Sequence, residues 1–216
     1  MLDYRDLDIY CEDQTFPELV HLIEAKLSNG WFRDIGEEER LKPVITSKFL
    51  YCFSCDATDT RKAALLSLMQ RARGNFYVPN VVPREIGHLS YQDYNAILEE
   101  FYYLFVQPAA KESGAELVLS SNEKSLEDWL SKDAILALKR FSKGANKSTG
   151  SAHPSDNERW ISFLISAHSE KSPLTPTDLG RWLVEDEAWP EDVVNDLLVE
   201  YEFSRELLRA YEKRNS

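Results

Sequence analysis

The clearest hydrophobic pattern in the chain lies between residues 90 and 114, where apolar side chains recur at the i, i+3, i+4, i+7 spacing of an α-helix. Ser90 stands where an N-cap is expected and Gly114 where the helix should stop. Pro108 removes one backbone donor, so we expect a kink or the end of the regular helix near Gln107. The apolar stripe, which we expect to organise the surrounding core, consists of Tyr94, Ile97, Leu98, Phe101, Leu104 and Phe105.

Four segments show the pattern of β-strands. Residues 44–55 alternate best, and residues 115–121 are apolar at their centre and bounded by turn residues. Residues 7–11 alternate over a shorter stretch. Residues 76–82 are strand-like, but their prolines favour a sheet edge or an extended loop. The first half of the chain is therefore predicted to contain a sheet.

Two further helices are predicted in this half. Residues 16–27 follow Thr15 and stop at Gly30, which is typical of a helix C-terminus. Residues 61–73 have helical spacing, with Ala64, Leu65, Leu68, Met69 and Ala72 on one stripe. Together these elements predict an α+β layer with helices on one face of a small sheet.

After residue 121 the pattern becomes entirely helical. Ser125 and Asp128 form a capping-box pattern before a helix predicted to reach Phe141, and residues 142–155 are rich in small polar residues, as in a loop. Prolines 154, 176 and 190 each precede another amphipathic helix. We therefore predict a helix-rich α+β protein with an α+β domain at 1–122 and an all-α helical bundle at 125–216, as two domains or one continuous domain.

Composition narrows the classes of function. The chain has 216 residues and a net charge of −12, which argues against nucleic-acid binding because phosphate contacts need clustered Lys and Arg. Three cysteines do not make a disulfide framework, the N-terminus lacks the order of a secretory signal, and no apolar run approaches a membrane span. We expect a cytoplasmic protein with no membrane association.

Cys52 and Cys55 form a C-x-x-C pattern, which occurs in zinc and redox sites. A zinc site would need two further ligands, and no second C-x-x-C or H-x-x-x-H pattern is present. A redox site usually places the second cysteine at a helix, whereas four polar residues follow Cys55 here. Buried, inert cysteines are the favoured interpretation. We assign no metal and no cofactor.

The loop at residues 142–155 contains candidate anion-binding residues. Its composition resembles that of a phosphate-binding loop, but Asn146 precedes the lysine where a Walker A motif needs glycine. Residues 134–155 contain four bases and no acid, and a following helix N-terminus could hold an anion. A plain connecting loop is the simpler interpretation. We assign no catalytic residue; the anion-binding candidates are Lys143, Lys147, Ser148, Thr149 and His153.

Residues 184–204 contain eight acids and no base. Asp192, Asp196 and Glu200 recur every four residues on one helical face, where like charges repel. A solvated face is the simplest explanation, and a basic partner or the basic segment at 134–155 would relieve the repulsion. The candidate partner-binding residues are Glu185, Asp186, Glu187, Asp192, Asp196 and Glu200.

These patterns favour a non-enzymatic, intracellular, acidic protein-binding module for a basic protein partner. An immunity or antitoxin-like role against a basic toxin would use the same charge complementarity. The alternative is an enzyme that acts on a phosphorylated or anionic small molecule near Lys147 and His153. A third hypothesis, a mimic of nucleic-acid charge, needs acids on a continuous and regularly spaced surface.

Overall fold

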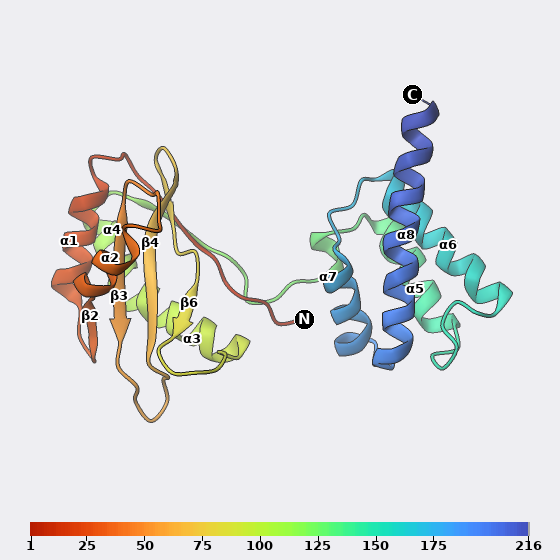
Figure 1. Ribbon diagram of the computed structural model, residues 1–216, viewed down its shortest axis with the longest axis horizontal. Helices are drawn as coiled ribbons and strands as arrows, with labels where there is room; N and C mark the ends of the chain where they lie inside the picture. The colour runs from red at the N-terminus through yellow and green to blue at the C-terminus, as the bar shows by residue number, and fades with distance from the viewer. Residues whose placement is uncertain (216) are drawn as a thin grey trace. The chain divides into compact units, whose positions relative to one another are not determined.

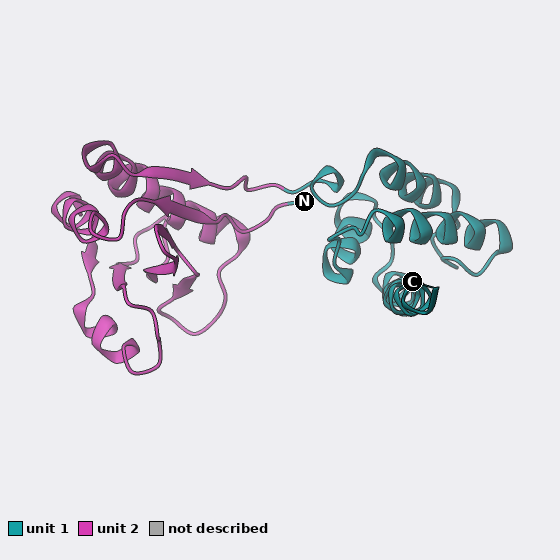
Figure 2. Cartoon of the chain, turned by 90° about the horizontal axis from the view of Figure 1, so that it is seen from above, with its two compact units in different colours: residues 1, 124–216 teal, residues 2–123 magenta. Residues whose placement is uncertain are grey.

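The computed structural model describes residues Met1–Asn215 and divides the chain into two compact units. One unit comprises Leu2–Glu123, and the other begins at Lys124 and includes Met1 (Figure 2). The first is an antiparallel sheet with helices and the second is helical, which confirms the predicted α+β class. Within the described residues, no helix combines the length and hydrophobicity that a membrane span requires.

The strands of the N-terminal unit form one antiparallel sheet in the order β2-β3-β4-β5-β1-β7, with β6 paired to β4. Residues of helix α1 (Phe16–Lys26) and of the segment after Ser90 share one hydrophobic core with the inward side chains of the sheet. Helix α2 (Ile35–Leu41) packs against β3. The strands are β1 (Leu7–Tyr10), β2 (Trp31–Arg33), β3 (Leu50–Cys55), β4 (Ala64–Ala72), β5 (Asn75–Tyr77), β6 (Val81–Pro83) and β7 (Glu116–Leu119).

The helix predicted at residues 61–73 is wrong, because this segment is the central strand β4. Ala64, Leu66 and Leu68 are buried and alternate with half-buried neighbours, as in a strand whose two faces differ. The segment also fits a helical stripe through Ala64, Leu65, Leu68, Met69 and Ala72, and long-range pairing decides between the two patterns. β4 pairs with β3 along a continuous register from Leu50↔Met69 to Cys55↔Ala64. The strand predicted at 44–55 begins only at Leu50.

The helix predicted from Ser90 to Gly114 is confirmed, with a change of winding at its centre. Ser90 Oγ accepts the Asp93 amide at 3.1 Å, and Gly114 ends the helix in the left-handed region at φ 76°. Between α3 (Tyr91–Phe101) and α4 (Gln107–Ser113) the chain makes a π-helical segment, Tyr102–Val106. Regular winding is therefore lost just before Pro108, as expected for a helix that has to accommodate a missing donor.

The C-terminal unit consists of helices (Figure 1), and its core contains buried aromatic side chains, including Trp160, Phe163 and Tyr201. The single helix predicted from residue 125 to Phe141 is wrong. Ser125 and Asp128 do form a capping box, but on a separate 3₁₀ turn, η2 (Leu126–Asp128). The other helical elements of the C-terminal unit are α5 (Lys132–Gly144), α6 (Pro154–Ser169), α7 (Pro176–Arg181), the π-helical segment η3 (Trp182–Asp186) and α8 (Glu191–Asn215).

Arg61, just before β4, is the most heavily bonded buried cation of the N-terminal unit. Its side chain is 6% exposed, and its guanidinium bonds Glu100 on α3 at 2.5 Å. It also donates to the carbonyl oxygens of Asn29 at 2.7 Å and Asp56 at 3.0 Å, and it lies 5.3 Å from the ring centroid of Trp31. Arg61, which lies just before β4, thus connects this strand to the segment before β2, to the end of β3 and to α3.

Replacing Arg61 with Met should destabilise the N-terminal unit by about 2–3 kcal/mol, because Glu100 and two carbonyl groups lose their donor. Arg71→Met is the matched control. Arg71 pairs with Asp8, but its side chain is 48% exposed, so we expect less than about 1 kcal/mol. Urea unfolding followed by the fluorine signal of 5-fluorotryptophan at Trp31, the only tryptophan of this unit, measures both. Equal effects would contradict the proposed role of Arg61.

Candidate functional site

The acidic segment identified in the sequence spans η3 and the first half of α8, and several of its acids have partners within the helical unit. Glu185 Oε1 accepts a 3.1 Å hydrogen bond from Arg181 Nε. Asp186 lies 3.6 Å from the N-terminal ammonium group. Glu200 accepts the Ser151 hydroxyl at 2.7 and 2.9 Å. These acids therefore help to hold the unit together.

Asp192 and Asp196 are different, because neither forms a hydrogen bond or ion pair through its side chain with a described residue. Both are exposed on α8. Asp192 lies in the first turn, where the helix dipole favours a negative charge. Asp196 lacks that support, and the four-residue spacing makes the two carboxylates repel each other by a few tenths of a kcal/mol. This pair is the part of the predicted partner-binding set that remains available to another molecule.

An apolar stripe that the sequence analysis missed continues from these acids along α8. Val199, Phe203, Leu207 and Tyr211 recur every four residues, and 67, 65, 56 and 66% of their respective surfaces are exposed. The spacing from Asp196 to Val199 is three residues, so acids and apolar residues share one face. We call this the outer face of α8; it consists of Asp192, Asp196, Val199, Phe203, Leu207 and Tyr211.

The spacing that forms the outer face is visible in the sequence, but the same helix also carries a buried stripe. Val194, Leu197 and Tyr201 pack into the helical core on the other side of α8. The buried stripe is enough to predict a helix here. The sequence therefore gives no separate reason to look for a second, exposed apolar stripe on the same helix. The last turns of α8 also project past the neighbouring helices (Figure 1).

The candidate anion-binding residues do not converge on a common point. The ammonium group of Lys147 donates to the Glu187 carbonyl oxygen and lies 5.8 Å from the ring centroid of Trp189. The carboxylate of Glu187 accepts the Ser142 hydroxyl at 2.7 Å. His153 is the N-cap of α6 and accepts the Ser155 amide at 3.3 Å. Lys147 and His153, the two residues of the enzyme hypothesis, therefore each have a structural contact within their own unit.

Of the remaining candidates, Ser148 and Thr149 lie beside acids and Lys143 is exposed. Ser148 and Thr149 line a shallow cavity of about 320 Å³ between the α5–α6 loop and α8, and its lining includes Asp196 and Glu200. Ser148 is bonded to the side chain of Asn146, and Lys143 is exposed at the end of α5. Two carboxylates make this cavity unfavourable for an anion. The predicted anion site thus gains no support from the geometry.

The cysteine pair lies on β3 and is buried. Burial raises the pKa of Cys52 to about 12, and neighbouring carboxylates, Glu38 first, add to the effect. Burial also raises the pKa of the Cys55 thiol. Cys55 packs in the main core, whereas the amide of Cys52 bonds Glu38 of α2 at 3.1 Å. Among residues 1–215, no group of three or more His, Cys, Asp or Glu side chains has an arrangement that could hold a metal ion.

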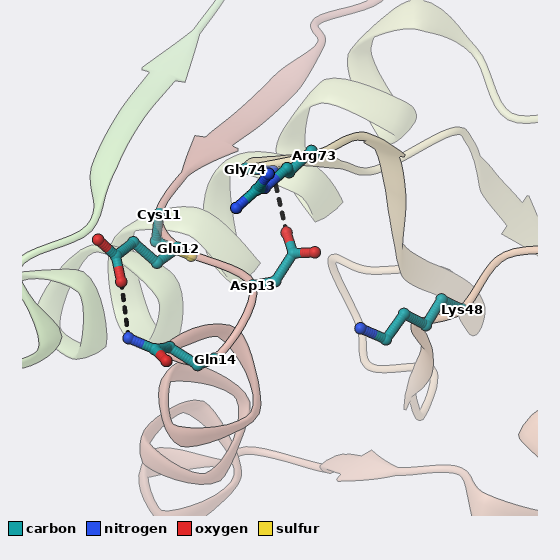
Figure 3. A pocket seen from close by; sticks show the side chains of 7 residues that line it. All are labelled: Cys11, Glu12, Asp13, Gln14, Lys48, Arg73 and Gly74. Carbon is teal, nitrogen blue, oxygen red and sulfur yellow. Dashed lines mark hydrogen bonds between the residues drawn. The ribbon is translucent and has the colours of Figure 1, made fainter.

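A surface depression of about 860 Å³ lies where the end of β1, the start of α1 and the β4–β5 turn meet (Figure 3). Asp13 accepts the Gly74 amide at 3.0 Å and the Gln70 side chain at 2.8 Å, and these bonds lower its pKa. Burial, followed by the charge of Asp13, raises the pKa of Cys11 to about 11. Asp13 therefore fastens the turn, and Cys11 is a poor nucleophile.

The three thiols should react with iodoacetamide in a set order. The thiolate is the reactive form, so the raised pKa of Cys11 should make it about 100-fold slower than an unperturbed cysteine near pH 8. Its rate should rise about tenfold per pH unit below pH 11. Cys52 and Cys55 should react only on unfolding. Peptide mass mapping of native and urea-treated protein measures this, and rapid native labelling of Cys52 would contradict it.

The comparisons with known proteins add no family assignment. No family model matches the chain, and neither a curated protein nor a solved structure was found to match it. Function is therefore inferred from the chemistry of the described surface, and the outer face of α8 combines exposed apolar side chains with carboxylates that have no partner in the described residues.

Proposed function

We propose that the chain is a non-enzymatic binding protein that engages a basic partner protein through the outer face of α8. One observation carries this proposal: two unpaired carboxylates and a stripe of more than half-exposed apolar side chains share a single helical face. Exposed apolar patches with a polar rim are typical of protein–protein interfaces. The apolar stripe would supply the buried centre of the interface and the acids its charged rim.

The mode of binding follows from the shape of the element. A single projecting helix with anchors spaced by four residues fits into an apolar groove of a partner. Basic residues at one end of the groove would meet Asp192 and Asp196, and the charge of −12 over the whole chain would speed the encounter. Rapid association is most useful to a protein that neutralises a basic toxin, such as an immunity protein or antitoxin. We therefore favour this role for the chain.

The alternative functions have less support. Mimicry of nucleic-acid charge requires acids at regular intervals along a surface, and the outer face changes from acidic to apolar at Val199. An enzyme acting near Lys147 and His153 would require these side chains to face a substrate, whereas both are engaged in contacts with their own unit.

Reversing the charge of both unpaired acids, in Asp192→Lys with Asp196→Lys, should slow association with the partner about tenfold or more at low salt and abolish the salt dependence of the rate. The partner is first captured with the full-length protein and identified by mass spectrometry. The matched control is Glu39→Lys with Glu85→Lys, which changes the net charge equally at exposed positions of the other unit. A control as slow as the test variant would show that only net charge matters.

Truncating the apolar part, in Phe203→Ala with Leu207→Ala, should act on dissociation instead. Loss of two anchors should speed dissociation by about tenfold or more and leave the association rate nearly unchanged. Tyr103→Ala with Leu104→Ala is the control, because these apolar side chains are about half exposed in the N-terminal unit. Biolayer interferometry gives both rates. A dissociation rate equal to that of the wild type would count against the outer face as the binding surface.

A further inference from the structure

A cavity of about 280 Å³ lies in the C-terminal unit between the end of α6, the residues that follow it and the middle of α8. Three cations line it: Lys171 from the loop after α6, and Arg205 and Arg209 from α8. Leu164 and Tyr201 contribute apolar surface. The cavity is at the small end of the range for ligand pockets and combines apolar walls with convergent polar groups.

The three cations keep hydrogen-bonding capacity that the described protein does not use. Arg205 donates from Nη1 to the Leu174 carbonyl oxygen at 2.9 Å and packs over the ring of Tyr201, which holds the guanidinium in place. The guanidinium also interacts with the Tyr201 hydroxyl, so only part of its donor capacity faces the cavity. Lys171 and Arg209 form no hydrogen bond or ion pair through their side chains with a described residue. Three positive charges, of which Arg205 is held by its contacts, thus line one small space.

A fourth group in the lining, the imidazole of His168, has a buried ring nitrogen, Nε2, that forms no hydrogen bond with a described residue. Glu212, the one acid of the lining, places a carboxylate oxygen 3.0 Å from this nitrogen but without hydrogen-bond geometry. A buried polar atom without a partner is costly, and such atoms often face a ligand or water. His168 and Glu212 form a contact pair in the wall of the cavity, and the three cations carry the argument for an anionic occupant.

Ordinary structural causes account for only part of this cluster. The dipole at the C-terminus of α6 favours one positive charge near Lys171. It does not explain Arg205 and Arg209, which lie within α8 and repel each other at a spacing of four residues. In a chain with twelve more acids than bases, a cavity with three cations and one acid is an unusual concentration of positive charge.

We propose that this cavity binds a small phosphate monoester. Lys171, Arg205 and Arg209 would hold the phosphate group, since a dianion with three outer oxygens matches several fixed cationic donors. Leu164 and Tyr201 would contact a compact apolar part of the ligand. The two arginines also border a depression that Val199 and Phe203 of the outer face line, so this site adjoins the apolar part of the proposed partner-binding surface.

Isothermal titration of the full-length protein with phenyl phosphate, inorganic phosphate and benzoate tests the proposal. Phenyl phosphate should bind, and Arg209→Gln should weaken it about tenfold or more, because one charge-assisted hydrogen bond is lost. Lys171→Gly should weaken it similarly without loss of stability, since Lys171 has a φ of 54°, which glycine adopts more easily. Arg214→Gln, at the exposed end of α8, should bind as the wild type does.

Three results would overturn the proposal. One is no binding of phenyl phosphate at millimolar concentration by the wild type. Another is equal weakening by Arg214→Gln, which would show a general charge effect. The third is benzoate binding as tight as that of phenyl phosphate, which would exclude the preference for phosphate. The variant Asp192→Lys with Asp196→Lys should bind phenyl phosphate normally, so failure here and failure of partner binding are distinguishable.

Discussion

A buried guanidinium needs a partner for each of its donors, and the N-terminal unit is arranged around this requirement at Arg61. The side chain takes acceptors from three other segments: Glu100 on α3 and the carbonyl oxygens of Asn29 and Asp56. Leaving any of these groups unpaired in a low-dielectric interior is costly. A single side chain therefore links β2 and β3, the central strand β4 and the helix α3, in addition to their shared hydrophobic core.

A second buried charge follows the same rule. Glu38 is 3% exposed, and Arg33 bonds both of its carboxylate oxygens, while the Cys52 amide bonds one of them. The glutamate sits in a run of three acids that, in the sequence, indicates only a solvated loop or helix start. Its burial depends on Arg33 of β2 reaching the same place. Acidic character by itself thus gives little information about exposure in this protein.

In the C-terminal unit, α8 is the element with the most consequences for function. One of its sides supplies Val194, Leu197 and Tyr201 to the helical core. The outer face is acidic and then apolar, and a third side contributes Arg205 and Arg209 to a cationic cavity. A long helix can combine these roles because residues one or two apart point in different directions. Two distinct binding chemistries are thereby compatible with one structural helix.

The sequence by itself determined the α+β class, the ends of α1, the cap and stop of the helix from Ser90 to Gly114, and the strands β1 and β7, because caps, glycines and local periodicity are properties of neighbouring residues. It placed residues 76–82 at a sheet edge or in a loop, whereas β5 lies between β4 and β1. It also indicated Asp192 and Asp196 as exposed acids. Only the tertiary structure decided that residues 61–73 form a strand, since pairing with β3 selects between two patterns that fit equally well locally. The partners of Lys147, and the convergence of Lys171 with Arg209, likewise depend on side chains distant in the chain, which no local pattern brings together.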